Sequence, residues 1–167
     1  MLQAGGRTLA LAAVLVLWAG AGWAQTRSAL IEDARALRLE RGERVVIRPA
    51  ADGRLELVSA MLAAEAEALP PRPGAANASP EVAPGTVAIV LGGDGRGSTL
   101  KLDSGLSLAF DYRATATTAG REASAATCTV LPLLASYESW PGRAERAVLR
   151  GFAARETNEV VCTEPQG

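Results

Sequence analysis

The thiol chemistry open to this chain rests on two cysteines, Cys128 and Cys162. In an oxidising compartment an isolated pair of this kind forms a disulfide, and closing the loop between them would stabilise the fold by roughly 4 kcal/mol. A redox-active or metal-binding pair would need close Cys-x-x-Cys spacing or a histidine, and the sequence has neither. We therefore predict a structural disulfide between Cys128 and Cys162.

The absence of histidine limits nucleophilic and metal chemistry more than any other feature of the sequence. Ser/His/Asp and Cys/His sites need an imidazole to carry protons near neutral pH, so neither can be built here. Zinc and copper sites rely on His or Cys, and the two cysteines are already assigned to each other. The glycine-rich segment 92–97 is followed by Ser98 where a phosphate-binding loop requires lysine, so we expect a hairpin turn there. The sequence predicts no metal and no cofactor.

Three carboxylates, Asp94, Asp103 and Asp111, remain as groups that could bind calcium or perform acid–base chemistry. Calcium needs six or more oxygens, and the Asp-x-Asp-x-Asp spacing that often supplies them is missing. A pair of carboxylates at a suitable separation could hydrolyse a glycosidic bond. We expect solvated strand ends, and we keep a small carboxylate-dependent hydrolase acting on glycans as the alternative function.

Tyr137 and Trp140 are the candidate binding residues, in a segment predicted as a loop just before Pro141-Gly142. An exposed aromatic pair on a rigid loop can anchor a protein, peptide or sugar partner. The alternative is that Trp140 fills an open end of the domain next to the disulfide.

The elements that must position these groups are mainly strands. Residues 99–103 alternate strictly between apolar and polar types, which favours a strand with one buried face. Two β-rich runs flank Asp52-Gly53, a dipeptide that favours a hairpin turn. Further strands are predicted over 86–91, 106–117, 127–131, 147–149 and 158–162, and short helices over 28–36 and 60–69. The predicted fold is mainly β: a small β-sandwich or barrel-like antiparallel domain with one or two short N-terminal helices and one disulfide.

The first 24 residues have the three-part pattern of an export signal. Arg7 supplies a positive start, residues 8–18 are uncharged and largely apolar, and small residues lead to Ala24. The apolar run is short for a bilayer span of about 20 residues, although an uncleaved anchor is the alternative. We predict a signal peptide over 1–24 and one exported β-rich domain over 25–167, in which the Pro-rich segment 69–85 is a flexible connection.

Net charge and composition limit the partners that the chain can attract and indicate its compartment. The 17 basic and 18 acidic residues nearly balance, so there is no long-range attraction to nucleic acid or to a membrane surface. Lys101 is the only lysine, and the wealth of arginine and alanine is typical of GC-rich bacterial genomes, which indicates a periplasmic or secreted protein. The sequence thus predicts an exported non-catalytic domain that binds a protein or cell-envelope component.

Overall fold

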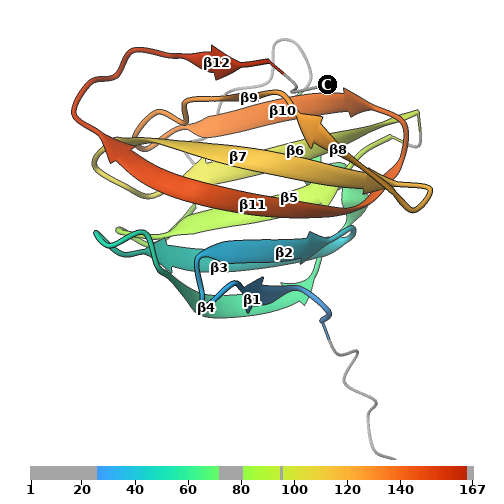
Figure 1. The fold of residues 1–167 in the computed structure, drawn as a ribbon, viewed down its shortest axis with the longest axis horizontal. Coiled ribbons are helices and arrows are strands. Elements are labelled where there is room, and N and C mark those ends of the chain that lie inside the picture. The colour runs from blue at the N-terminus through green and yellow to red at the C-terminus, as the bar shows by residue number, and fades with distance from the viewer. Residues whose placement is uncertain (1–25, 72–80, 95, 165–167) are drawn as a thin grey trace, which may run out of the picture.

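The computed structural model of the chain describes residues 26–71, 81–94 and 96–164. The predicted signal peptide, residues 1–24, lies outside the described residues, as do residues 72–80 of the predicted Pro-rich connection. The described chain is mainly antiparallel β-sheet, as predicted (Figure 1).

Two five-stranded sheets lie face to face as a sandwich (Figure 1). The strand order is β1-β2-β11-β7-β8 in sheet 1 and β10-β6-β5-β3-β4 in sheet 2. Sheet 1 consists of β1 (Ala29–Ile31), β2 (Ala36–Glu40), β7 (Ala109–Thr118), β8 (Arg121–Ala125) and β11 (Ala144–Arg155). Sheet 2 consists of β3 (Glu43–Pro49), β4 (Leu55–Leu62), β5 (Val87–Gly92), β6 (Gly97–Ser104) and β10 (Ala135–Pro141). A separate ribbon pairs β9 (Thr127–Cys128) with β12 (Cys162–Thr163), and η1 (Glu65–Ala68) is a short 3-10 helix.

The core lies between the two sheets and follows from the alternation of side chains along each strand. Inward-facing aliphatic residues of both sheets are fully buried, among them Leu37, Leu39, Val45, Ile47, Ile89, Leu91, Leu100, Leu102 and Leu149. Sheet 1 adds an aromatic cluster in which Phe110, Tyr112 and Phe152 have ring centroids 5.9–6.3 Å apart. This core fixes the register of the sandwich, because a slip of one residue would turn the apolar set outward.

The predicted hairpins and the disulfide are confirmed. β3 and β4 pair around Asp52-Gly53, where Gly53 has φ +77°, and β5 pairs with β6 around the glycine-rich turn. Cys128 and Cys162 are bonded and lie opposite each other in the β9–β12 ribbon. These features depend on local spacing or on a single pair of cysteines, which explains why the sequence predicts them.

Neither predicted helix is confirmed over its predicted range. Ala29–Ile31 is β1, in which Leu30 lies opposite Leu37 of β2, and Glu32, Asp33 and Ala34 form a turn with φ of 54°, 53° and 63°. A helix that short is unfavourable in isolation, whereas strand pairing lets Leu30 pack against the core. Over 60–69, β4 continues to Leu62 beside β3, and only η1 is helical.

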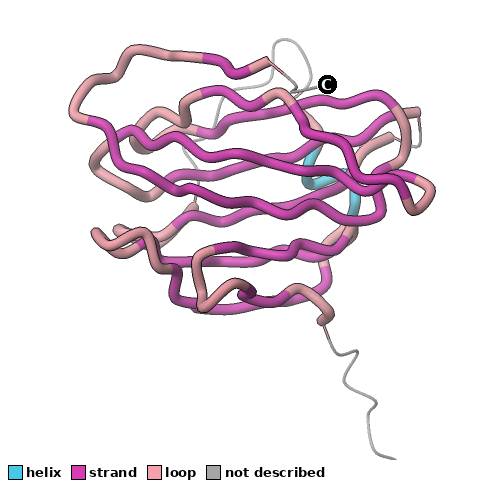
Figure 2. Tube along the Cα trace, in the orientation of Figure 1, coloured by secondary structure: helices cyan, strands magenta, loops and turns pink. Residues whose placement is uncertain are grey.

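The turns of the sandwich gather at two ends. The closed end carries η1, the β5–β6 turn and the β10–β11 turn; η1 is the cyan segment in Figure 2. The open end carries the β3–β4 turn, the β6–β7 turn and the entry to β5. We use these two names below, because the ends differ in chemistry.

A buried polar network seals the closed end. The Arg41 side chain is 6% exposed and donates to Glu65 Oε2 at 2.8 Å, to Ser98 Oγ at 3.0 Å and to Ala144 O at 3.2 Å. Ser98 Oγ in turn donates to Gly142 O and accepts from Ala144 N, and Arg143 forms a second ion pair with Glu65. Burial opposes ionisation of Glu65, but the hydrogen bonds from Arg143 and Arg41 outweigh it and lower the pKa of this carboxyl. The network therefore joins η1 to both sheets.

Candidate functional site

Tyr137 and Trp140 lie on strand β10, which corrects the predicted loop. β10 pairs with β6 along its whole length, and residues 137 and 140 point to opposite faces of sheet 2 because their spacing is odd. Trp140 is only 9% exposed and belongs to the core, while Tyr137 is half-buried on the outer face opposite Lys101. The two rings do not form a joint surface.

Trp140 closes the gap between the two sheets where β10 and β8 are edge strands. Its indole N–H donates to Ala126 O at 3.2 Å, close to the disulfide in sequence. The ring also lines a cavity of about 730 Å³ with small side chains such as Ala116, Ala123 and Ala125. Trp140 therefore packs in the core along the side of the sandwich, whereas the alternative placed it at an open end next to the disulfide.

Glu138, between these two residues, is a buried carboxylate without an ion-pair partner among the described side chains. Its Oε1 accepts from Cys128 N at 2.7 Å. Burial raises the pKa of Glu138, and the bond from Cys128 only partly offsets this effect. Burial and the nearby Glu138 charge likewise raise the pKa of Tyr112 well above its usual range. Sequence reasoning missed Glu138, because a single Glu in a strand carries no recognisable signal.

The three candidate carboxylates are kept apart. Asp94 accepts from Arg96 N, and this backbone hydrogen bond lowers the pKa of Asp94. Asp103 is buried on the outer face of sheet 2 and pairs with Lys101 at 2.9 Å, and Asp111 accepts from Thr129 at 2.6 Å. Among the described residues, no hydrogen bond, ion pair or common partner joins any two of the three. The geometry therefore gives each carboxylate a local structural partner in place of a second carboxylate.

The largest apolar cavity among those described opens at the open end of the sandwich. It has a volume of about 810 Å³ and takes its walls from turns that are far apart in sequence: residues 49–53, 84–85 and 105–108, together with Leu133 and Ala153–Ala154. Its volume lies within the range of about 300–1,000 Å³ that is usual for small-ligand sites.

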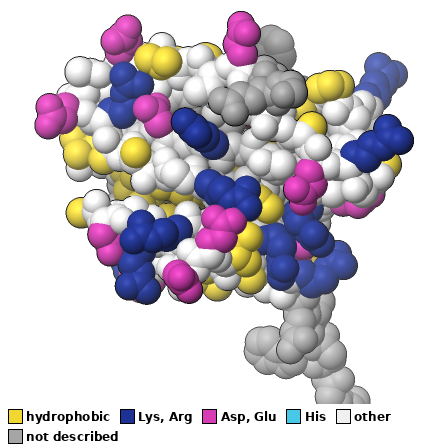
Figure 3. Space-filling view, viewed as in Figure 1, with side chains coloured by type: hydrophobic (Ala, Val, Ile, Leu, Met, Phe, Trp, Pro, Cys, Tyr) yellow, Lys and Arg dark blue, Asp and Glu magenta, His cyan; other side chains and the backbone are white. Residues whose placement is uncertain are grey.

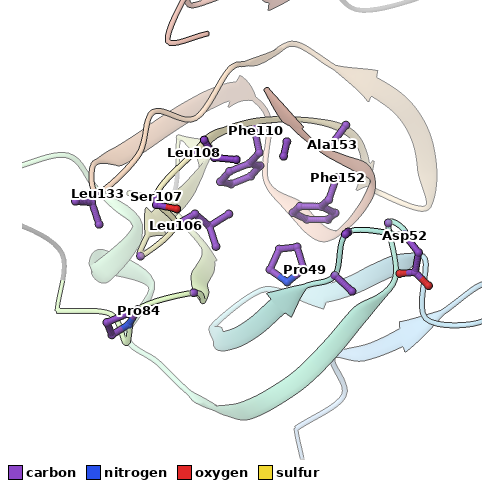
Figure 4. Close-up of a pocket in the computed structure, with 16 residues that line it drawn as sticks. Pro49, Asp52, Pro84, Leu106, Ser107, Leu108, Phe110, Leu133, Phe152 and Ala153 are labelled. Atoms are coloured by element: carbon purple, nitrogen blue, oxygen red, sulfur yellow. The ribbon is translucent and has the colours of Figure 1, made fainter. Parts of the chain in front are cut away.

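Aromatic and aliphatic side chains point into this cavity (Figure 4). Phe110 and Phe152 stack with centroids 5.9 Å apart and are almost fully buried, so they form a firm inner wall. Leu108 and Leu133 stand at the mouth with 50% and 61% of their surface exposed. Such exposed leucines beside a preformed apolar wall mark a surface that is suited to contact with another molecule.

The polar groups of this cavity are structural. Asp52 is the one titratable residue in the lining, and its Oδ1 accepts from Arg54 N within the β3–β4 turn. The strand predicted over 106–117 begins only at Ala109, so Leu108 lies in the turn before β7. Sequence reasoning missed the cavity because its lining comes from separate turns.

Comparison of the chain with protein-family models, with curated proteins and with solved structures finds no match. Within the described ranges, no group of three or more Asp, Glu, Cys or His side chains gathers as a metal site. The part of the chain that the structure describes also contains no helix long and apolar enough to cross a membrane. Function must therefore be inferred from the geometry of the cavities and from the charges around them.

Proposed function

We propose that this chain is an exported, non-catalytic β domain that binds a protein or cell-envelope component, one apolar group of which enters the open-end cavity. The observation that carries the proposal is the pairing of a firm aromatic wall with two exposed leucines at the mouth. Burial of one leucine-sized side chain contributes about 1.5–3 kcal/mol, so filling such a cavity is a strong source of affinity.

The lining supports binding in preference to catalysis. Asp52 is the one titratable side chain in the described lining, and this carboxylate caps the β3–β4 turn at the rim (Figure 4). A catalytic site needs a second acid–base group within hydrogen-bond reach of the substrate. No such group lines the cavity among the described residues.

Export is supported by the signal-peptide pattern of residues 1–24 and by the disulfide. Cys162 lies in an exposed ribbon at the surface, where cytosolic reductants would reach the bond. A periplasmic or secreted location would keep it oxidised.

Site-specific photo-cross-linking in the native host tests the proposal. The photoreactive residue p-benzoylphenylalanine is introduced at Leu133, and in a separate variant at Leu62 on the β4 edge, which is equally exposed at 59% against 61%. The proposal expects one discrete cross-linked product from position 133 and only background from position 62. Equal labelling from the two positions, or no product from position 133, would contradict it.

A further inference from the structure

A second, polar pocket lies on the outer face of sheet 1, away from the open-end cavity. It has a volume of about 460 Å³ and lies between β7, β8, β11 and the end of β12. Its lining includes Arg113 and Arg150 and the hydroxyl-bearing residues Thr115, Ser124 and Thr163. Basic and acidic side chains are interspersed over the face that Figure 3 presents, so the arrangement of individual charges decides what the pocket can bind.

The two arginines are direct neighbours across the β7–β11 ladder. Arg150 lies opposite Arg113 in register, and like charges in this position destabilise a sheet. Arg150 donates to Glu32 Oε1 from Nε at 2.8 Å and from Nη2 at 2.6 Å, so Glu32 balances its charge. Arg113 is exposed and forms no ion pair among the described residues. Arg113 is thus the positive charge of the ladder that has no ion-pair partner in the described part of the chain, and Glu164 is the carboxylate of the lining that stands against it.

A β-bulge leaves open space beside this charge. The β7–β11 register shifts between Arg150 and Ala153, so Gly151 and Phe152 of β11 together face the single residue Tyr112. Gly151 has φ +65°, and a Cβ at this position would meet nothing within 4 Å. The bulge turns Phe152 into the core while bare backbone forms part of the pocket lining next to Arg150.

The disulfide holds the last wall of the pocket in place. Thr163 and Glu164 follow Cys162, and Thr163 Oγ1 lies 3.0 Å from Thr127 Oγ1 across the β9–β12 ribbon. Glu164 is the one carboxylate in the lining, and it would oppose the entry of an anion.

We propose that this pocket binds a phosphate group, with Arg113 as its principal ligand and Arg150 as a second. The planar guanidinium fork donates two parallel hydrogen bonds to phosphate oxygens, and hydroxyl groups nearby can satisfy the others. Phosphate would relieve the repulsion between the two arginines that Glu32 relieves only in part. Free phosphate and the phosphodiester of a lipid headgroup share this chemistry, so the experiment must separate them.

The test titrates the oxidised domain with inorganic phosphate at low ionic strength and follows backbone amide resonances by NMR. Wild type should show saturable shifts at Gly151 and Thr163. Arg113→Gln should weaken binding about tenfold or more, since a hydrogen bond to a charged group contributes about 1.5–3 kcal/mol. Glu164→Gln should tighten it. Arg54→Gln removes the same charge from an exposed position in the β3–β4 turn and serves as the matched control, with less than about a twofold change expected from screened charge alone.

A second arm measures co-sedimentation with vesicles of phosphatidylglycerol in phosphatidylcholine, against phosphatidylcholine alone. Binding in either arm that depends on Arg113 but not on Arg54 supports the site, and the responding arm identifies the source of the phosphate. If neither arm shows saturable binding, or if Arg113→Gln and Arg54→Gln behave alike, the proposal is overturned. The amide spectrum of each variant also reports directly whether it is folded.

Discussion

The two ends of the sandwich differ in the described groups that cover the core. At the closed end, Arg41, Glu65 and Ser98 form hydrogen bonds with one another and with the nearby backbone, and η1 packs over the sheets. At the open end, Phe110 and Phe152 form the last layer of the core, and the space beyond them is lined with apolar side chains that no other described element covers.

We infer from this difference that the closed end serves stability and the open end serves binding. A buried hydrogen-bonded network fixes the relative position of elements, because loss of one member removes hydrogen bonds from the others. An uncovered apolar wall contributes little to the stability of the free domain and gains free energy only when something fills it. Substitutions at the closed end should therefore change stability, and those at the mouth of the open end should change binding.

The largest expected effect is at Arg41. Arg41→Met should lower the free energy of unfolding by about 2–4 kcal/mol, because it removes three hydrogen bonds from a buried guanidinium and leaves Ala144 O without this donor. Arg143 binds the same Glu65 carboxylate from an exposed position, so Arg143→Met should cost less than about 1 kcal/mol. Urea unfolding of the two variants measures the contrast, and equal losses would show that the closed end is not held by Arg41.

Two serines, one at each end, should show a smaller difference in stability loss. Ser98→Ala removes a hydroxyl that bonds Gly142 O, Ala144 N and Arg41, and should cost about 1–3 kcal/mol. Ser107→Ala, in the lining of the open-end cavity, should change stability by less than about 0.5 kcal/mol. Thermal unfolding compares them, and a larger loss at Ser107 would reverse the assignment of roles.

The pH dependence of stability separates a carboxylate that has arginine partners from one that has none. Glu65 has a lowered pKa, so its contribution is present above the unfolded value near 4.5 and is lost as the pH falls. Glu138 has a raised pKa, so the native state binds its proton more tightly and stability is lost as the pH rises from 4.5 through the folded value.

Glu138→Gln keeps the acceptor for Cys128 N and removes the charge. The variant should melt at a higher temperature than wild type at pH 8 and at nearly the same temperature at pH 4. Scanning calorimetry at both pH values checks this, and a variant that is less stable at pH 8 would show that the Glu138 charge is stabilised by its surroundings.

The smallest effect on stability is expected at the mouth of the open end. Leu108→Ser combined with Leu133→Ser should change the free energy of unfolding by less than about 0.5 kcal/mol per site, since both side chains are half or more exposed. For the cross-linking experiment, the photoreactive residue is moved to Leu106 in the cavity lining, because position 133 is serine in this variant. The double variant should then give no discrete cross-linked product. If a stable variant still forms the product, the open end is not the binding site.

The sequence predicts what depends on local spacing. The β3–β4 and β5–β6 hairpins follow from turn residues between alternating strands, and the disulfide follows from two cysteines without alternatives. The strand β10 was missed because Pro141-Gly142 is typical of loops, yet a proline at the end of an edge strand breaks no ladder bond.

The features that divide the two ends depend on contacts between distant parts of the chain. Arg41 and Ser98 are 57 residues apart, and Arg41 and Ala144 are 103 apart, so no window of sequence contains the closed-end network. The open-end cavity likewise takes its lining from turns between different strands. Such features become visible only once the register of both sheets is known.

Titration with N-phenyl-1-naphthylamine, a neutral apolar fluorophore, is the most direct test of the open end as a binding site. Wild type should enhance its fluorescence in a saturable way with one site per chain. The Leu108→Ser and Leu133→Ser double variant should weaken binding about tenfold or more, as expected for the loss of two apolar side chains from the site. Val58→Ser with Leu62→Ser, which removes equally exposed apolar groups from β4, should leave it unchanged. No saturable signal in wild type, or equal weakening by both double variants, would contradict the assignment.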